Sequence, residues 1–489
     1  MLALLGMSIV FGEGKAVDIG NRKQLFIDDR LIAESSGLTF EVHSPVKQGA
    51  ILKPELPSEA GRIGPYGSVV RNGDDLLMWY WAMERREGGK GRRSLALARS
   101  TDGYRWERPV LDLVERGGSK ENNVVPAAGD TVSLNPNGPD EERFVLLRPQ
   151  SFNDPERGGL YLSFSADGIH WKKDQTRLFP FLPDTQNQVQ YDRRLGKWVA
   201  YLRVWDPDRR VGRVEIDDVK KPWPYDKTAK THFIWGKDHP PVPRDEIPTV
   251  FATDDLDPKD SDVYTPVVVE YPWAQDVYLM FPSLYQHFPE PKQGGKYAND
   301  GLLDIHLAVS RDGIAWHRPS RRPYMPLGRL DEPDSKRLYM FAGMLRTGDT
   351  IHHYYGGSQL THGEYAGDKS LHGTGSVCHA TQRLDGFVSV HAGVEGGRLL
   401  THPLIFDGVR LELNLAAAAT GSCRVEIRDA DGKPIPGFGL DDCDIIRGNA
   451  VAWTVTWKGK HDVMALAGSP IQLVIELTNA DLYALQFRR

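Results

Sequence analysis

The chain has 489 residues, of which 40% are hydrophobic and 26% charged, values that are ordinary for a soluble globular protein. Its net charge of −6 at pH 7 gives no support for a nucleic-acid partner. An aromatic content of 10%, with 49 glycines and 33 prolines, indicates an all-β chain with many turns. The three cysteines, an odd number without metal-ligand spacing, do not indicate a disulfide scaffold, and a bridge between Cys423 and Cys443 remains open.

Residues 1–15 begin with a short apolar run from Met1 to Phe11. The run has no basic residues before it and is too short to span a bilayer, so no membrane partner is expected. We interpret residues 1–15 as the remnant of a signal peptide. This interpretation favours a secreted or periplasmic location and leaves a cytoplasmic one open.

Residues 16–49 contain one alternating stretch, Gln24 to Ile32, that ends in charged residues. Alternation of this kind indicates a strand. We expect this N-terminal segment either to close the ring of sheets inferred below, as an outer strand, or to cap its lower side.

One phrase then recurs along the chain, a strand followed by Ser-x-Asp-Gly-x-x-Trp. Its three copies end at Trp106, Trp171 and Trp316. Asp-Gly supplies a tight turn in which the glycine takes a positive φ, and the serine or aspartate side chain can bond the backbone of the turn. The three tryptophans are therefore predicted to occupy equivalent buried positions between strands, with a structural rather than a catalytic role.

Two degenerate copies fill the gaps between these phrases. One runs from Gly212 to Asp218 and is followed by Trp223, and the other runs from Ser376 to Phe387. Each phrase follows two further strand signals, which predicts sheets of four antiparallel strands. Five such units over residues 50–392 predict a five-bladed β-propeller. Its turns are expected at Asp102, Asp167, the region of Asp217, Asp312 and Asp385.

Residues 393–489 lack the repeated phrase and instead contain stretches in which apolar and polar residues alternate, such as Arg410 to Asn414 and Ile471 to Leu477. Turns such as Asp431-Gly432 separate these stretches. The pattern predicts a C-terminal β-sandwich of about 90 residues.

This combination of domains resembles the glycoside hydrolases of family 32, and the propeller alone resembles families 43 and 130. The repeated phrase resembles a shortened sialidase Asp-box, and Leu400 to Phe487 is similar to the sandwich of family-32-like bacterial proteins. The resemblance implies a glycoside hydrolase without a cofactor, acting on an oligosaccharide or polysaccharide. The Trp-x-Asn-Asp-Pro-Asn-Gly, Arg-Asp-Pro and Glu-Cys motifs of family 32 are absent, and Asn153-Asp154-Pro155 is interpreted as a turn. The chain is therefore a divergent relative, and no catalytic residue carries over by motif.

Candidate site residues follow instead from topology. Cleavage of a glycosidic bond usually needs two carboxyl groups about 5 to 10 Å apart, one of them with a raised pKa. Acids at the start of the innermost strand of each blade should meet at the mouth of the channel. The predicted catalytic residues are Asp184, Asp262, Glu59, Asp130 and Glu332, with Asp184 the first choice. The predicted sugar-binding residues are Arg62, Tyr66, Gln186, Asn187, Arg203, Tyr264, Asp304 and His306.

Several alternatives remain open at this stage. A non-catalytic sugar-binding propeller would lack a carboxyl pair. A phosphorylase would have a phosphate site of arginine, lysine or histidine beside one acid. A lyase on the same fold is a further alternative. The insertion between Leu284 and His306 is a candidate lid. The sugar, the linkage, the stereochemical course and the oligomeric state are left open. No metal site is expected, because the histidines of the fifth unit lack metal-ligand spacing: His352, His353, His362, His372 and His379.

Overall fold

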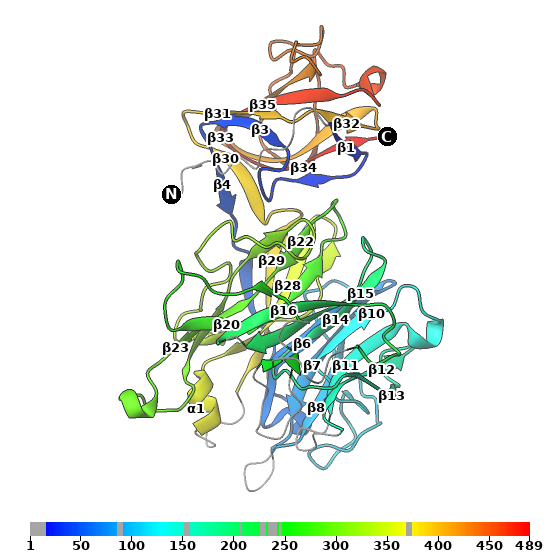
Figure 1. Cartoon of the computed structure of the whole chain (residues 1–489), viewed down its shortest axis with the longest axis vertical. Coiled ribbons are helices and arrows are strands. Elements are labelled where there is room, and N and C mark those ends of the chain that lie inside the picture. The colour runs from blue at the N-terminus through cyan, green and yellow to red at the C-terminus, as the bar shows by residue number, and fades with distance from the viewer. Residues whose placement is uncertain are drawn as a thin grey trace. The chain divides into compact units, whose positions relative to one another are not determined.

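The computed structural model describes residues 16–85, 91–150, 157–205, 207–224, 231–232, 242–243, 247–367 and 374–489. Nearly all regular structure in these ranges is β-strand (Figure 1). The exception longer than one 3₁₀ turn is the short helix α1 (His362–Gly367), so no helix in the described ranges could cross a membrane. The apolar run before residue 12, the Asn153-Asp154-Pro155 turn and His372 lie outside the described residues.

The chain divides into two compact units that are discontinuous in sequence. The first unit contains the residues up to Ser44, Tyr271–Val277 and Arg383–Arg489. The second contains Pro45–Glu270 and Tyr278–Gln382. Each end of the chain therefore belongs to the first unit, and the chain leaves and re-enters the second unit between its two ends.

The second unit contains three antiparallel sheets of four strands. The first two are built from consecutive strands, whereas the last strand of the third follows a separate two-stranded sheet. Strand Val124–Val125 at the edge of the first is only two residues long, and Thr249–Phe251 at the edge of the third only three. The sheets are β6 (Arg62–Asn72), β7 (Asp75–Met83), β8 (Arg93–Ser100) and β9 (Val124–Val125); β10 (Thr131–Leu134), β11 (Phe144–Gln150), β12 (Gly159–Ser165) and β13 (Lys172–Phe179); and β14 (Gln188–Asp192), β15 (Lys197–Trp205), β16 (Arg209–Ile216) and β19 (Thr249–Phe251).

The next strands are interrupted in the middle. Pro266 and Pro282 fall at two of the breaks, because proline has no N–H to donate to a neighbouring strand. The interrupted strands are β20 (Ser261–Thr265) with β21 (Val268–Glu270), β22 (Tyr278–Met280) with β23 (Ser283–His287), and β24 (Gly301–Ile305) with β25 (Ala308–Ser310).

The last sheet of this unit joins the two ends of its sequence. It continues from β20, β23 and β24 in the order β26 (Arg337–Met340), β28 (Thr350–Ser358), β29 (Ser376–Arg383) and β5 (Val46–Leu52), with β27 (Leu345–Thr347) also paired to β28. The link between β24 and β26 is one parallel pair, Leu303 with Arg337. Strand β5 precedes all the other sheets in sequence, yet it pairs antiparallel with β29. Strand β6, the first strand of the first four-stranded sheet, contacts β10 of the next sheet and also β26 and β28 of the last one. The sheets therefore form a propeller-like ring.

The repeated phrase has one geometry in its three full copies. In each copy the serine Oγ accepts a hydrogen bond from the glycine N–H at 2.9 Å, as for Ser100 and Gly103. The aspartate carboxylate accepts two further backbone N–H groups, and the tryptophan Nε1 donates to the glycine carbonyl. Trp106, Trp171 and Trp316 occupy equivalent positions, as predicted, but they are partly rather than fully buried.

Each turn also docks on the preceding sheet of the ring. Gly168 lies at φ +74° and its carbonyl accepts a hydrogen bond from Trp79 Nε1 at 2.8 Å; a Cβ at this position would lie 2.4 Å from the Trp79 ring. The carbonyl groups of Gly103 and Gly313 accept hydrogen bonds from Tyr354 and Tyr201 in the same way. The repeats therefore link neighbouring sheets as well as turning the chain.

The N-terminal segment belongs to the first unit up to Ser44, and only its last residues, which begin β5, belong to the ring. Strands β1 (Val17–Gly20), β2 (Gln24–Leu25), β3 (Ile32–Ser36) and β4 (Leu38–Val42) pair with β32 (Leu404–Phe406), β35 (Ile471–Arg488), β31 (Gly397–Thr401) and β30 (Val388–Ala392), respectively. Phe26 and Leu31 are buried in the core of this unit, which explains why the stretch from Gln24 to Ile32 packs here. Closure of the ring falls instead to β5.

The first unit contains one ten-stranded sheet rather than two separate sheets. Its longest strands, β33 (Arg410–Asp429) and β35, pair along most of their length and shift register between Ala417 and Ser422; β34 (Asn449–Thr454) pairs with β33. Strands of this length can bend at such irregularities, so the sheet curls around a single apolar core. Cys423 and Cys443 lie in this core as free thiols.

The histidines near β28 and β29 form a buried network and no metal-binding group within the described ranges. His352 Nδ1 lies 3.0 Å from His379 Nε2, and their rings are stacked. His353 Nε2 lies 3.2 Å from Gln382 Oε1. Burial lowers the pKa of His352 and of His353 to about 4 and the pKa of His379 to about 3.

These histidines make stability depend on pH. Below about pH 6.5 these histidines bind protons in the unfolded chain but stay neutral in the folded chain. The free energy of unfolding should therefore fall as the pH drops from 6.5 towards 4. Urea titrations at steps of pH would measure this slope. The double variant His352→Gln/His379→Gln should show a shallower slope; an unchanged slope would mean that other groups control acid stability.

Candidate active site

Aromatic rings from neighbouring sheets meet near the ends of the inner strands. Tyr66 on β6, Tyr264 on β20 and Tyr339 on β26 form one buried cluster with Tyr285 of β23. The ring centres of Tyr66 and Tyr264 each lie 5.6 Å from that of Tyr339. Trp81 packs edge-on against Tyr66 at 4.7 Å. The ring of sheets thus brings together side chains that lie more than 250 residues apart in sequence.

Asp184 stands on the loop that leads into β14. Asn187 holds this loop, because its amide donates to the carbonyl groups of Pro183 and Thr185 while its oxygen accepts the backbone N–H of Arg203. Thr185 has a φ of +95°, a strained conformation for a β-branched residue, and its hydroxyl lies 3.0 Å from that of Tyr66. Strain of this kind is common where a loop is held in place for function.

The Asp184 carboxylate forms an ion pair with Arg203 at 2.5 Å. The Asp184 side chain is 43% exposed whereas that of Arg203 is 1% exposed, so the pair has one open and one buried end. The guanidinium of Arg203 also lies over the ring of Tyr264, 4.9 Å from its centre. Arg203 thus joins the Asp184 carboxylate to the aromatic cluster.

Asp130, immediately before β10, has the opposite environment. It is 4% exposed, and its Oδ1 has no hydrogen-bond partner. The nearest cation is Arg93, 3.9 Å away, whose guanidinium lies over the ring of Trp81. Burial raises the pKa of Asp130 to about 7; Arg93 opposes this shift and the charge of Asp184 adds to it. The environment of Asp130 therefore favours its protonated form much more than that of an ordinary aspartate.

Asp262 on β20 is the third carboxylate of the group, and it is buried like Asp130. Its Oδ2 lies 2.7 Å from Arg209 and 3.2 Å from His287 Nε2, whereas its Oδ1 has no partner. Burial raises the pKa of Asp262, but hydrogen bonds from His287 and Arg209 outweigh burial and the net pKa is lowered. Arg209 also lies 4.4 Å from the ring centre of Trp205.

A hydrogen-bonded chain connects this group to helix α1. His362 Nδ1 lies 2.9 Å from the carbonyl oxygen of Asn299 and must donate to it, so Nε2 accepts the hydroxyl proton of Tyr264 at 3.0 Å. Burial, with a contribution from Arg337, lowers the pKa of His362 to about 4, which keeps the imidazole neutral. The side chain of Asn299 also contacts Arg209, so the loop between β23 and β24 reaches the group from outside.

Three of the five predicted catalytic acids interact with one another or with a shared partner. The charge of Asp184 acts on Asp130, and the charge of Arg203 acts on both Asp184 and Asp262. Glu59 and Glu332 are used elsewhere. The Glu59 carboxylate accepts hydrogen bonds from Tyr80, Arg108 and two backbone N–H groups, and Glu332 accepts the backbone N–H of Arg329. Both acids hold local turns, which is the common role of acids at such positions.

The predicted sugar-binding residues divide in the same way. Tyr66, Tyr264 and Arg203 belong to the group around Asp184, whereas Gln186 and Asn187 are fully buried and hold the loop. Arg62 lies over the ring of Tyr365 in α1 at 4.0 Å. Sequence reasoning missed Arg93, Arg209, His287 and His362, because they lie outside the innermost strands.

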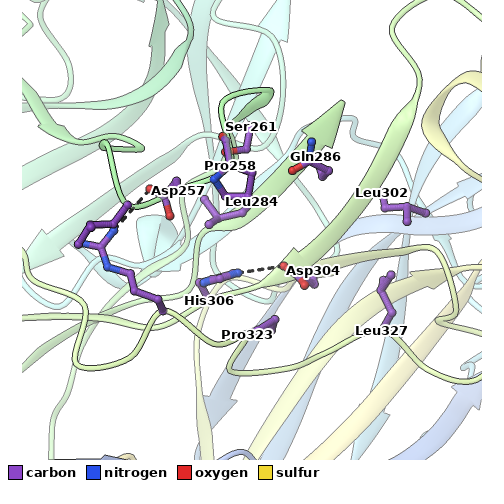
Figure 2. A pocket seen from close by; sticks show the side chains of 12 residues that line it. Asp257, Pro258, Ser261, Leu284, Gln286, Leu302, Asp304, His306, Pro323 and Leu327 are labelled. Carbon is purple, nitrogen blue, oxygen red and sulfur yellow. Dashed lines mark hydrogen bonds and ion pairs between the residues drawn. The ribbon is translucent and has the colours of Figure 1, made fainter. Parts of the chain in front are cut away.

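Asp304 and His306 line a cavity of about 320 Å³ (Figure 2). Asp304 Oδ1 is 3.1 Å from His306 Nε2. Asp304 pairs with Leu284, and the next pair along the same two strands is Leu303 with Tyr285 of the aromatic cluster. Neighbouring residues of a strand face opposite sides, so the cavity and the cluster lie on opposite faces of β23 and β24. The structure therefore does not bring Asp304 and His306 together with the aromatic cluster.

Comparisons with known proteins find distant likenesses among solved structures. No family model matches the sequence, and no curated protein matches it either. One solved structure, a glycoside hydrolase, has a TM-score of 0.43 and 16% sequence identity, and the match covers 70% of this chain and 92% of that chain. A second comes from a study of family 130 mannoside phosphorylases and hydrolases that target β-1,2-mannosidic linkages in Candida mannan; its TM-score is 0.42, its identity 14%, and the match covers 70% of this chain and 94% of that chain. A third, a glycosyl hydrolase from Bacteroides ovatus, has a TM-score of 0.42 and 14% identity, and the match covers 74% of this chain and 97% of that chain. The chain resembles these propeller proteins and is divergent from them in sequence. Identities this low transfer no functional residue.

Proposed function

We propose that the chain is a glycoside hydrolase in which Asp130 donates a proton to the leaving oxygen and Asp184 acts as the ionised nucleophile or base. The observation that carries the proposal is the unlike environment of two interacting carboxyl groups. Asp130 is buried and its pKa is about 7, whereas Asp184 is half exposed and paired with Arg203. A proton donor beside an ionised carboxylate is the pair that glycosidic cleavage requires.

The surrounding side chains support a saccharide as substrate. Tyr66, Tyr264 and Trp81 offer aromatic surface, and Asp262 with Arg209 offers polar groups next to it. Sugars present apolar C–H faces and hydroxyl groups, so they require both kinds of contact. In this proposal Asp262 and Arg203 orient the substrate and Tyr264, fixed by His362, shapes the floor of the site.

The proposal includes the finer architecture. We assign the interrupted strands β20 to β25 to a fourth blade and the sheet closed by β5 to a fifth, each with its innermost strand towards the axis. We also assign the curled ten-stranded sheet to a β-sandwich, because its apolar residues face one shared core. Export to the periplasm or the outside is part of the same hypothesis.

The pH dependence of turnover tests the assignment of Asp130. Because the acid must be protonated, kcat/KM on a nitrophenyl glycoside should fall as the pH rises through about 7. The profile should be measured from pH 5 to 9 on a panel of nitrophenyl glycosides. A rate that is constant across pH 7 on the active substrate would contradict the assignment.

Leaving-group dependence gives a second test of the same residue. Asp130→Asn should lose about 10²- to 10⁴-fold in rate on substrates with poor leaving groups. It should lose much less on a dinitrophenyl glycoside, whose leaving group departs without protonation. Glu332→Gln is the matched control, because that carboxylate holds a turn and should leave both rates unchanged. Equal losses on the two substrates would show that Asp130 is not the proton donor.

A second candidate is a glycoside phosphorylase. It is favoured by two guanidinium groups, Arg203 and Arg209, that lie beside Asp184 and Asp262 and over the same ring of Tyr264. Such groups suit a phosphate ion as attacking species. Incubation with substrate in inorganic phosphate, followed by mass spectrometry, distinguishes a sugar phosphate product from free sugar. Binding without either product would indicate a non-catalytic carbohydrate-binding protein.

A further inference from the structure

The first unit carries a compact group of imidazole and carboxylate side chains on one face of its sheet. His391 on β30 pairs directly with Asp481 on β35, and Ser389 pairs with Glu41 on β4. Residues two apart on a strand share a face, so Glu41, Ser389, His391 and Asp481 all point to the same side. Their neighbours Phe40, Val390 and Leu482 pack into the core on the other side. The face that carries the group is therefore the one turned away from the core.

The distances within this group match those between ligands of one metal ion. His391 Nδ1 lies 3.0 Å from Asp481 Oδ1, and His43 Nε2 lies 3.8 Å from the same oxygen. His391 Nε2 lies 3.9 Å from Glu41 Oε1. A single ion binds only one nitrogen of this ring, and with one atom taken from each of Glu41, His391 and Asp481 the three atoms lie within 4.8 Å of one another. In a tetrahedral zinc site with bonds of about 2.1 Å the ligand atoms lie about 3.4 Å apart, so small side-chain rotations would suffice.

The group differs from an ordinary surface cluster of acids in its donors. Glu41, His391 and Asp481 each offer one ligand atom, and these atoms all lie within 4.8 Å of one another, which is true of no other such group in the described ranges. His391 and Asp481 are only 28% and 23% exposed, so two of the three ligands are partly shielded from water. Mixed nitrogen and oxygen donors of this kind suit first-row divalent cations and not Mg²⁺ or Ca²⁺.

We propose that Glu41, His391 and Asp481 bind one Zn²⁺ ion, with His43 or water as the fourth ligand. This differs from the expectation that the chain binds no metal, which considered only the histidines of the ring. Glu41 comes from the N-terminal segment, His391 from the strand after the ring, and Asp481 from the C-terminal strand. The ion would cross-link three strands that are distant in sequence, and its role is structural.

The test is zinc titration of the full-length protein after treatment with EDTA and removal of the chelator. Calorimetry should show one equivalent of Zn²⁺ bound and no comparable binding of Mg²⁺. The melting temperature should rise with zinc concentration, because zinc binds the folded state. His391→Gln and Asp481→Asn should each weaken zinc binding by at least about tenfold. His461→Gln, at an exposed histidine of the same unit, is the control and should bind zinc like the parent protein.

Co²⁺ provides a readout that does not depend on the folding of a variant. The intact protein should give the strong visible absorption bands of tetrahedral Co²⁺, and one equivalent of Zn²⁺ should abolish them. Absence of binding in the parent protein would overturn the proposal. Zinc binding that survives in His391→Gln or is lost in His461→Gln would also overturn it, because the ion would then bind elsewhere.

Discussion

Asp184→Asn is expected to lower kcat on an aryl glycoside by at least about 10³-fold. The substitution removes the negative charge that must attack or activate water, yet it keeps an oxygen that can accept the hydrogen bond from Arg203. The chain should therefore still fold, as judged by circular dichroism and a cooperative melt. Turnover should be compared with that of Glu332→Gln, in which a carboxylate outside the group is lost.

Chemical rescue separates the role of Asp184 from that of a merely structural residue. Asp184→Ala leaves space at a position that is 43% exposed in the parent protein, so a small anion can enter. Azide or formate should restore part of the rate if Asp184 is the nucleophile or base. Activity within tenfold of the parent in Asp184→Asn would contradict the catalytic assignment, even with the fold unchanged.

Trp79→Ala should give the largest loss of stability among the aromatic residues of the ring, about 3 to 5 kcal/mol in urea titrations. Trp79 is fully buried, packs against Phe144 and Trp171, and donates a hydrogen bond to the carbonyl of Gly168 in the next sheet. Its removal leaves a cavity between two sheets of the ring and takes away one of the two hydrogen bonds to the Gly168 carbonyl, which Trp171 Nε1 also donates to.

Two milder variants keep this prediction testable if Trp79→Ala fails to fold. Trp79→Phe retains most of the apolar contact but loses the N–H donor, so it should cost about 1 to 3 kcal/mol. Trp171→Ala removes a ring that is only partly buried and should cost less than Trp79→Ala. A loss below about 1 kcal/mol in Trp79→Ala would show that the turn of Gly168 does not hold the sheets together.

The sequence was most informative where structure is encoded locally. The phrase from Ser165 to Trp171 contains all the partners of its own hydrogen bonds, so its turn could be predicted from seven residues. The partner of the same turn on the preceding sheet, Trp79, lies 89 residues away, and no local pattern marks it. Likewise, the alternation of Gln24 to Ile32 indicated an extended segment but could not indicate which sheet it joins.

The sequence also predicted the candidate site only in part. Topology placed Asp130, Asp184 and Asp262 at the starts of inner strands, and the structure connects them through Arg93, Arg203 and Arg209. The same rule also selected Glu59 and Glu332, whose carboxylates hold turns, because an acid before a strand looks identical in either role. Arg203 was also selected from the sequence, whereas Arg93 and Arg209 lie on third strands and resemble ordinary surface charges in the sequence.

Closure of the ring by β5 and β29 has a consequence for how the chain folds during synthesis. The strand that completes the last sheet is made first, but its partner, Ser376–Arg383, is made some 330 residues later. The first unit also needs both ends of the chain. Neither unit can reach its final form on a ribosome until almost the whole chain has emerged, so the N-terminal strands have exposed edges for most of translation. Folding should therefore be slow and sensitive to chaperones that cover such edges.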